Sequence, residues 1–98
     1  TLGNGYGIFS GKDVQWATLR FTPERARWVA AEQWHPKQKG HWDSQGHWIL
    51  QIPYSDDREL VMDILRQTPE VEVLGPAGLR QRVLEKMREG LMRWGAVS

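Results

Sequence analysis

The stretch from Trp34 to Tyr54 carries a turn signal between two segments that can pair as strands. The turn residues run from Asp43 to Gly46. Asp and Ser favour type I turns, and glycine supplies the positive φ that closes a hairpin of three or four residues. Residues from His47 onward are rich in β-branched and aromatic types, which is typical of a strand. A hairpin is therefore the first predicted element, and it holds three of the six tryptophans and all three histidines.

Strand and helix patterns alternate along the chain on both sides of this hairpin. Strands show a period of two with one apolar face, and helices show apolar residues three and four positions apart. Helix ends follow from capping residues, prolines and glycines. The predicted strands span residues 14–21, 37–43, 47–54 and 70–74, and the predicted helices run from Thr22 to Pro36, from Ser55 to Thr68 and over residues 78–94.

The order of these elements predicts an α+β fold. Strand, helix, strand, strand, helix, strand is the ferredoxin-like βαββαβ pattern of an antiparallel sheet, here with an additional C-terminal helix. Right-handed crossovers place the first and third strands in the centre of the sheet and the other two at its edges. The two crossover helices then cover one face. The other face, called the open face below, is left for the additional helix, a partner or a ligand.

Caps and apolar stripes orient the three predicted helices. Thr22 caps the first helix ahead of Pro23, and Asp56 with Glu59 has the spacing of a capping box for the second. The apolar stripe of the first helix continues to Trp34, which we expect in the core together with Trp48. The last helix is expected to bury one face, made of Leu79, Val83, Met87, Leu91 and Trp94.

Length and charge limit the classes of function. The 98 residues fit one domain, and we expect residues 13–98 to form it behind a linker or junction at residues 1–12. The chain opens at Thr1 without an initiator Met, so we interpret it as part of a longer protein. A net charge of +1 lacks the strong basic bias of a dedicated nucleic-acid binder, although basic residues outnumber acidic ones in the last helix.

Catalysis, metal binding and cofactors are not expected. No cysteine is present, which excludes disulfides and thiol chemistry and fits a cytoplasmic protein, and no apolar run is long enough for a membrane span. The serines offer no nucleophile–base pair. His35, His41 and His47 are spaced by six residues. With Asp43 they could form a carboxylate–imidazole site, but turn and surface histidines are the interpretation that we favour.

The open face carries the clearest candidate site. Trp16 and Arg20 point to it from the first strand, and Glu72 is expected beside Arg20. A cross-strand ion pair is one interpretation. The other is a cation aimed at an anionic effector or at a carboxylate of a partner. Trp28 and Trp42 also lie off the inward pattern and are candidates for interface aromatics, which among basic residues can stack on nucleobases.

Several short segments resemble the WCX domain, the C-terminal extension of bacterial WYL-domain transcription regulators. Departures are Thr68-Pro69, where a glycine is common before the fourth strand, and Trp94, where a tyrosine is common. The matching segments, in order, are residues 5–9 (GYGIF), 18–21 (TLRF), 26–29 (ARWV), 34–38 (WHPKQ), the hairpin at Gly46, 71–76 (VEVLGP) and 79–80 (LR).

The resemblance implies a regulator with a winged helix-turn-helix, then a WYL domain, then this domain. The WYL domain would sense an effector, including nucleic acid, and this domain would dimerise and shape the response. DNA contact would come from a helix-turn-helix that this chain lacks, and the partners would be WYL domains of the same or the other protomer of a homodimer. Candidate ligand- or partner-binding residues are Trp16, Arg20, Arg27, Trp28, His35, Gln38, His41 and Trp42.

Overall fold

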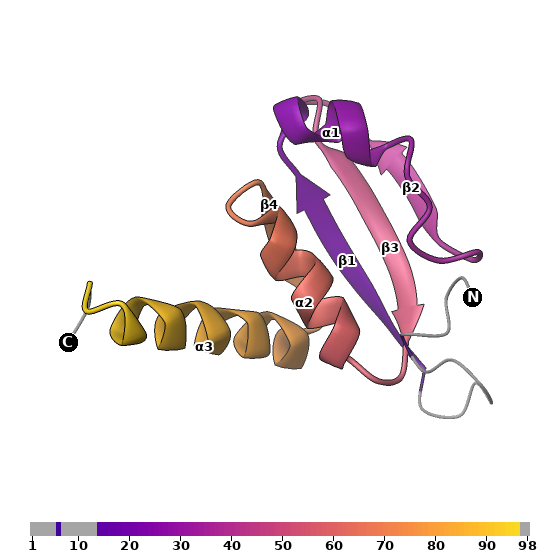
Figure 1. Ribbon diagram of the computed structural model, residues 1–98. Coiled ribbons are helices and arrows are strands. Elements are labelled where there is room, and N and C mark those ends of the chain that lie inside the picture. Colours follow the sequence, from indigo (N-terminus) through magenta and orange to yellow (C-terminus); the bar gives the residue numbers. More distant parts are fainter. Residues whose placement is uncertain (1–5, 7–13, 97–98) are drawn as a thin grey trace.

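The computed structural model describes Tyr6 and residues 14–96, and the predicted junction at 1–12 lies outside this part except for Tyr6. Within it, four strands form one sheet and three helices accompany them (Figure 1). The α+β class is therefore confirmed. The elements are β1 (Gln15–Phe21), α1 (Pro23–Val29), β2 (Lys39–Trp42), β3 (Trp48–Tyr54), α2 (Arg58–Gln67), β4 (Val71–Gly75) and α3 (Ala77–Arg93).

The sheet has the strand order β2-β3-β1-β4, and each neighbouring pair is antiparallel. The first and third strands are thus central, as predicted from right-handed crossovers. Alternation along β1 buries Ala17, Leu19 and Phe21 completely and leaves the residues between them partly or fully exposed. The period of two in the sequence therefore sets which face of the sheet meets the core.

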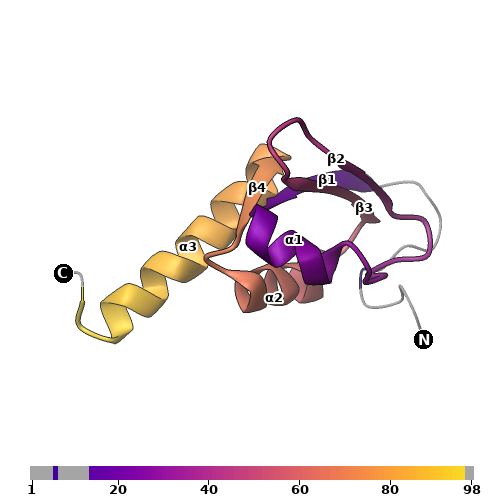
Figure 2. The same ribbon diagram turned by 90° about the horizontal axis from the view of Figure 1, so that it is seen from above.

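The helices lie on one side of the sheet. Seen from above, α1 and α2 pack below the sheet, and α3 starts beside β4 and runs outward past α2 (Figure 2). The core between these layers includes Phe21, Leu50, Leu60 and Ile64. The additional helix packs against β4 and α2, where it buries Leu79 and Val83, and does not cover the open face.

The hairpin forms as predicted. Gly46 has a φ of 86°, and the carboxylate of Asp43 accepts hydrogen bonds from the backbone N–H groups of Gln45 and His47, both at 2.8 Å. Close packing at the other end of the hairpin depends on Gly40. A Cβ on Gly40 would lie 2.1 Å from a ring carbon of Trp48, so only glycine lets this indole lie flat on the edge strand.

Two predicted helix boundaries are wrong. The first helix ends at Val29 and does not reach Pro36, because side-chain hydrogen bonds hold the following segment in a separate turn. The predicted capping box of the second helix is also absent. Asp56 Oδ1 accepts from the backbone N–H of Arg58 at 3.0 Å, and this local turn replaces the reach to a third helical residue.

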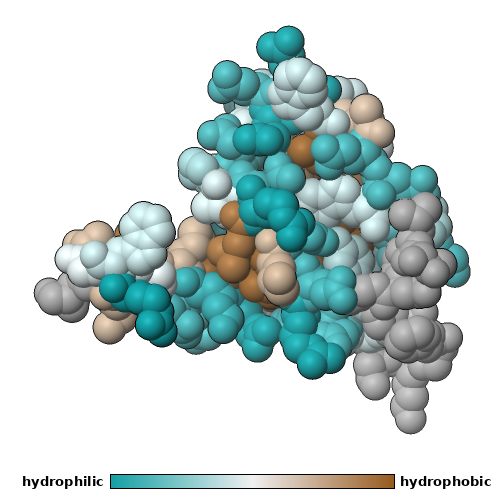
Figure 3. All heavy atoms as spheres, in the orientation of Figure 1, coloured by the Kyte–Doolittle hydropathy of each residue, from teal (hydrophilic) through white to brown (hydrophobic). Residues whose placement is uncertain are grey.

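The predicted stripe on α3 is only half correct. Leu79 and Val83 are buried and Met87 is partly buried, but Leu91 is 49% exposed and Trp94 is 88% exposed. The C-terminal half of α3 projects beyond the sheet and α2, so no other helix or strand in the described part of the chain reaches it (Figure 1). In the space-filling view, hydrophobic side chains are visible in the angle between α2 and α3 (Figure 3). No helix in the described part of the chain is long and apolar enough to cross a membrane.

Candidate partner-binding face of the sheet

The open face consists of side chains that alternate with the core residues of the strands. Thr18 of β1 lies beside Gln51 of β3, which lies beside Lys39 of β2. A second row crosses the sheet in the same way. It consists of His41, Ile49, Arg20 and Glu72, from β2, β3, β1 and β4 in turn. Within the described residues no helix covers these rows, so the sheet presents a polar surface around the exposed Trp16, whereas Ile49 is only 8% exposed.

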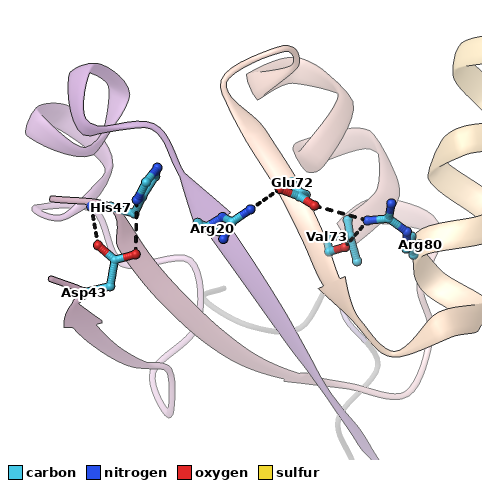
Figure 4. A network of polar contacts seen from close by, with 6 residues as sticks. All are labelled: Arg20, Asp43, His47, Glu72, Val73 and Arg80. Atoms are coloured by element: carbon cyan, nitrogen blue, oxygen red, sulfur yellow. Dashed lines mark hydrogen bonds and ion pairs between the residues drawn. The ribbon is translucent and has the colours of Figure 1, made fainter. Parts of the chain in front are cut away.

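Arg20 and Glu72 form the predicted cross-strand ion pair, with 2.5 Å between Nη2 and Oε1. Arg80 on α3 brings a second guanidinium to Glu72, because its Nη1 lies 3.5 Å from Glu72 Oε2 (Figure 4). The same Nη1 donates to the carbonyl oxygen of Val73 at 2.9 Å. The hydrogen bond from Arg20, with both positive charges, holds the pKa of Glu72 below its ordinary value against the opposing effect of desolvation.

One carboxylate thus serves two guanidinium groups. The side chains of Arg20 and Glu72 are 38% and 46% exposed, so water and an incoming anion can both reach the pair. Arginine presents five donors, and the single contact to Glu72 leaves donors of Arg20 free for a further carboxylate or phosphate. The arrangement can therefore accept an anionic group without first breaking the internal ion pair.

Trp16 and Lys39 form a second contact across the face. The Nζ atom of Lys39 lies 5.2 Å from the centre of the Trp16 ring, a distance at which the cation is attracted to the π face. Trp16 is 41% exposed. Within the described residues Lys39 has no carboxylate partner, so its charge adds to that of the two arginines. Among the described residues of the two rows and their direct contacts, the basic side chains Arg20, Lys39 and Arg80 therefore outnumber the carboxylate of Glu72.

The three histidines are not brought together. His47 Nδ1 lies 3.1 Å from Asp43 Oδ2 in the hairpin turn (Figure 4). His41 lies on the open face beside Ile49. His35 is buried against Tyr6, and the centres of the two stacked rings are 6.4 Å apart. No group of three or more potential metal ligands occurs among the residues that the structure describes.

His35 and Gln38 have internal partners in the loop after α1. Gln38 Oε1 accepts from the backbone N–H groups of Trp34 and His35 at 2.6 and 3.0 Å, and Gln38 Nε2 donates to the carbonyl oxygen of Glu32 at 3.0 Å. His35 Nδ1 accepts from the N–H of Lys37 at 2.9 Å. Burial, helped by the charge of Lys37, lowers the pKa of His35. These hydrogen bonds fix the conformation of the loop after α1, so His35 and Gln38 have a structural role there.

The remaining predicted site residues lie away from the open face. Arg27 and Trp28 share α1, where the guanidinium carbon lies 5.7 Å from the indole ring centre, and Trp28 is 63% exposed. Trp42 is 54% exposed and packs edge-on against Trp48 at 5.0 Å, on the helix side of the edge strand. The prediction that Trp16, Trp28 and Trp42 are exposed is confirmed, but the structure places them at three separate locations.

Two contributors were not among the predicted site residues. Arg80 reaches the open face from α3 across the edge strand β4, and the sequence offers no signal for this because its position on the helix is ordinary. Lys39 is the second contributor, and it contacts Trp16 from the edge strand β2. Its period-two spacing from His41 on β2 is the signal that places both on one face.

A comparison with protein families matches residues 13–91 to the WCX domain. No match is found among curated proteins. The matched range includes all four strands and all of α3 except its last two residues, and therefore the whole open face.

Proposed function

The chain belongs to the WCX domain family, and on this premise we propose that it is the C-terminal regulatory and dimerisation domain of a bacterial WYL-family transcription regulator. Such a domain would act in the cytoplasm, with DNA contacted through a helix-turn-helix elsewhere in the regulator. We also propose the ferredoxin-like class for its fold, which the antiparallel strand order β2-β3-β1-β4 supports.

The observation that carries this proposal is the uncovered open face. An antiparallel sheet can leave one face to water, and such faces are then evenly polar. Here Trp16 is 41% exposed, and Arg20 and Arg80 share one carboxylate. Exposed aromatic residues and arginines are both enriched at protein interfaces, and this face carries both. We propose that this face packs against a WYL domain of the same or the partner protomer.

The chemistry of the face defines its counterpart. Arg20 and Lys39 favour a partner surface that presents Asp or Glu carboxylates, and Trp16 favours an apolar side chain between them. If an effector changes the conformation of the WYL domain, the packing of that domain against the open face would change as well. That coupling is the means by which the domain would help transmit effector sensing to DNA binding.

Sedimentation of the intact regulator with and without residues 13–98 tests the dimerisation role. We expect a dimer with the domain and a monomer without it, both with folded remaining domains by circular dichroism. An unchanged oligomeric state after deletion would contradict the proposal.

A second candidate is direct binding of a nucleic acid or another anionic effector on the open face. The excess of Arg20, Lys39 and Arg80 over Glu72 favours it. Fluorescence titration with short single-stranded oligonucleotides at two salt concentrations tests this function, because phosphate contacts weaken as salt rises. Absence of tryptophan quenching at low salt would exclude it. A salt-sensitive signal that Arg20→Ala removes would support it.

A further inference from the structure

The C-terminal half of α3 exposes more apolar surface than its surroundings explain. Leu84, Leu91, Met92 and Trp94 are 43%, 49%, 54% and 88% exposed. These residues lie on a helix that projects away from the sheet and α2 (Figure 1). Single exposed apolar residues need no explanation, but several on one projecting helix indicate a surface that is covered by a partner.

Three residues of α3 and its C-cap residue, Trp94, form one stripe. Leu84, Met87, Leu91 and Trp94 follow one another by three, four and three positions, the spacing of helices that pair side by side. A hollow runs along this stripe between Leu84 and Leu91. Leu84 and Met87 also line a second hollow of about 130 Å³ between α3, α2 and β4. The stripe is therefore continuous with a gap at the base of the helix.

Charged residues next to the stripe are unpaired. Going round the helix from the stripe in one direction, Arg88 comes first and Glu85 next, and neither has an ion-pair partner within the described residues. On the opposite side of the helix, Lys86 and Glu89 already pair at 3.8 Å. In two antiparallel helices related by a twofold axis, like flanks face each other. A flank with one acidic and one basic residue one turn apart is then complementary to itself.

We infer that α3 pairs antiparallel with α3 of a second copy of this chain, with the twofold axis near Met87. This inference rests on the proposed dimerisation role and names the surface that performs it. With that axis, Glu85 of each copy faces Arg88 of the other. The stripe residues interleave, because Leu84 of one copy lies between Met87 and Leu91 of the other.

The same axis gives Trp94 a binding place. Its position on the helix lies opposite Arg80 of the second copy, which lines the 130 Å³ hollow. An indole there covers the hollow and stacks against the stem of that arginine. One helix pair is a small interface, so we expect a dissociation constant on the order of 100 µM for the 98-residue chain.

Charge reversal in the 98-residue chain tests the pairing. Glu85→Arg alone places two arginines opposite each other at both of the symmetry-related contacts beside the twofold axis, and Arg88→Glu alone places two glutamates there. Each should weaken the dimer about tenfold by sedimentation equilibrium. The double variant E85R/R88E should regain the wild-type constant. A mixture of the two single variants should form a heterodimer as tight as the wild-type dimer. Both side chains are exposed, so folding is not at risk.

A second measurement uses Trp94→Ala, with the exposed Trp28→Ala on α1 as its matched control. The first should weaken the dimer and the second should not. If neither the charge reversals nor Trp94→Ala change the dissociation constant, the dimer uses another surface. That result overturns the inference and leaves the dimerisation role intact. A chain that stays monomeric at millimolar concentration also overturns it. The role in the intact regulator is then decided separately by the deletion of residues 13–98.

Discussion

Arg20 and Glu72 pair across β1 and β4 with 2.5 Å between Nη2 and Oε1, at a site that stays open to water. Because both side chains are over a third exposed, we expect Arg20→Gln or Glu72→Gln to lower the free energy of unfolding by less than about 1 kcal/mol. Urea denaturation of both variants and of the double variant measures the coupling. A loss several times larger would give the pair a structural role and weaken its assignment to partner binding.

The pH dependence of this coupling has a defined sign. The pKa of Glu72 is lower in the folded chain than its ordinary value of 4.5. The stabilisation is therefore complete above that value and disappears as the pH falls through the lower folded pKa. Repeating the double-variant measurement at neutral pH and under acid conditions should show the coupling only at neutral pH.

Gly40 permits the packing of Trp48 on β2. A Cβ at this position would lie 2.1 Å from the Trp48 ring, so Gly40→Ala should displace the indole and lower the free energy of unfolding by about 1–3 kcal/mol. Gly78→Ala in α3 is the matched control, because its Cβ meets nothing within 4 Å. It should stabilise the chain by about 0.5–1 kcal/mol. Equal effects of the two substitutions would contradict this packing.

Gln38 holds the loop after α1 through three hydrogen bonds. Gln38→Ala should cost about 1–3 kcal/mol and speed hydrogen exchange at the amides of Trp34 and His35. Gln38→Glu keeps the accepting oxygens and loses only the donor to Glu32, so protection of those two amides should persist. Fast exchange in the glutamate variant as well would show that the amide group as a whole, and not its oxygen, orders the loop.

His35 should make stability depend on pH. Burial lowers its pKa below 6.5, so the unfolded chain binds a proton at a higher pH than the folded chain. The free energy of unfolding should be constant above about 6.5 with respect to this group and fall as the pH drops below it. His35→Asn keeps an acceptor for the N–H of Lys37 and should remove this slope.

The control for that measurement is His41→Gln, at an exposed position on β2. The slope should persist in this variant. If His35→Asn keeps the full slope, another group is responsible for it.

Period-two alternation and turn chemistry were sufficient to predict the sheet. The alternation of β1 and the positive φ of Gly46 are local consequences of residue type, and both appear where expected. The end of α1 could not be predicted in this way. Gln33 and Trp34 continue the helical spacing, but the helix ends at Val29, because Gln38 binds backbone groups of residues 32–35 from further along the chain.

Strand alternation also predicted part of the candidate site, but not the contacts that depend on strand register or on the packing of α3. Strand alternation placed Trp16 and Arg20 on the open face, and the pairing of Arg20 with Glu72 followed from the expected strand order. The contact of Lys39 with Trp16 depends on the register of three strands, which spacing alone does not define. Arg80 contacts Glu72 only because α3 packs along the β4 edge and not on the open face.

The most direct measurement is calorimetric titration of this chain with the isolated WYL domain of the same regulator. We predict saturable binding that weakens as salt is added. Arg20→Glu should weaken this binding by about tenfold or more, because the new carboxylate repels the carboxylates of the partner. Arg27→Glu on α1, away from the open face, should bind as the wild type does. Absence of binding at millimolar concentration, or equal binding by Arg20→Glu and the wild type, would contradict the claim that the open face receives a WYL domain.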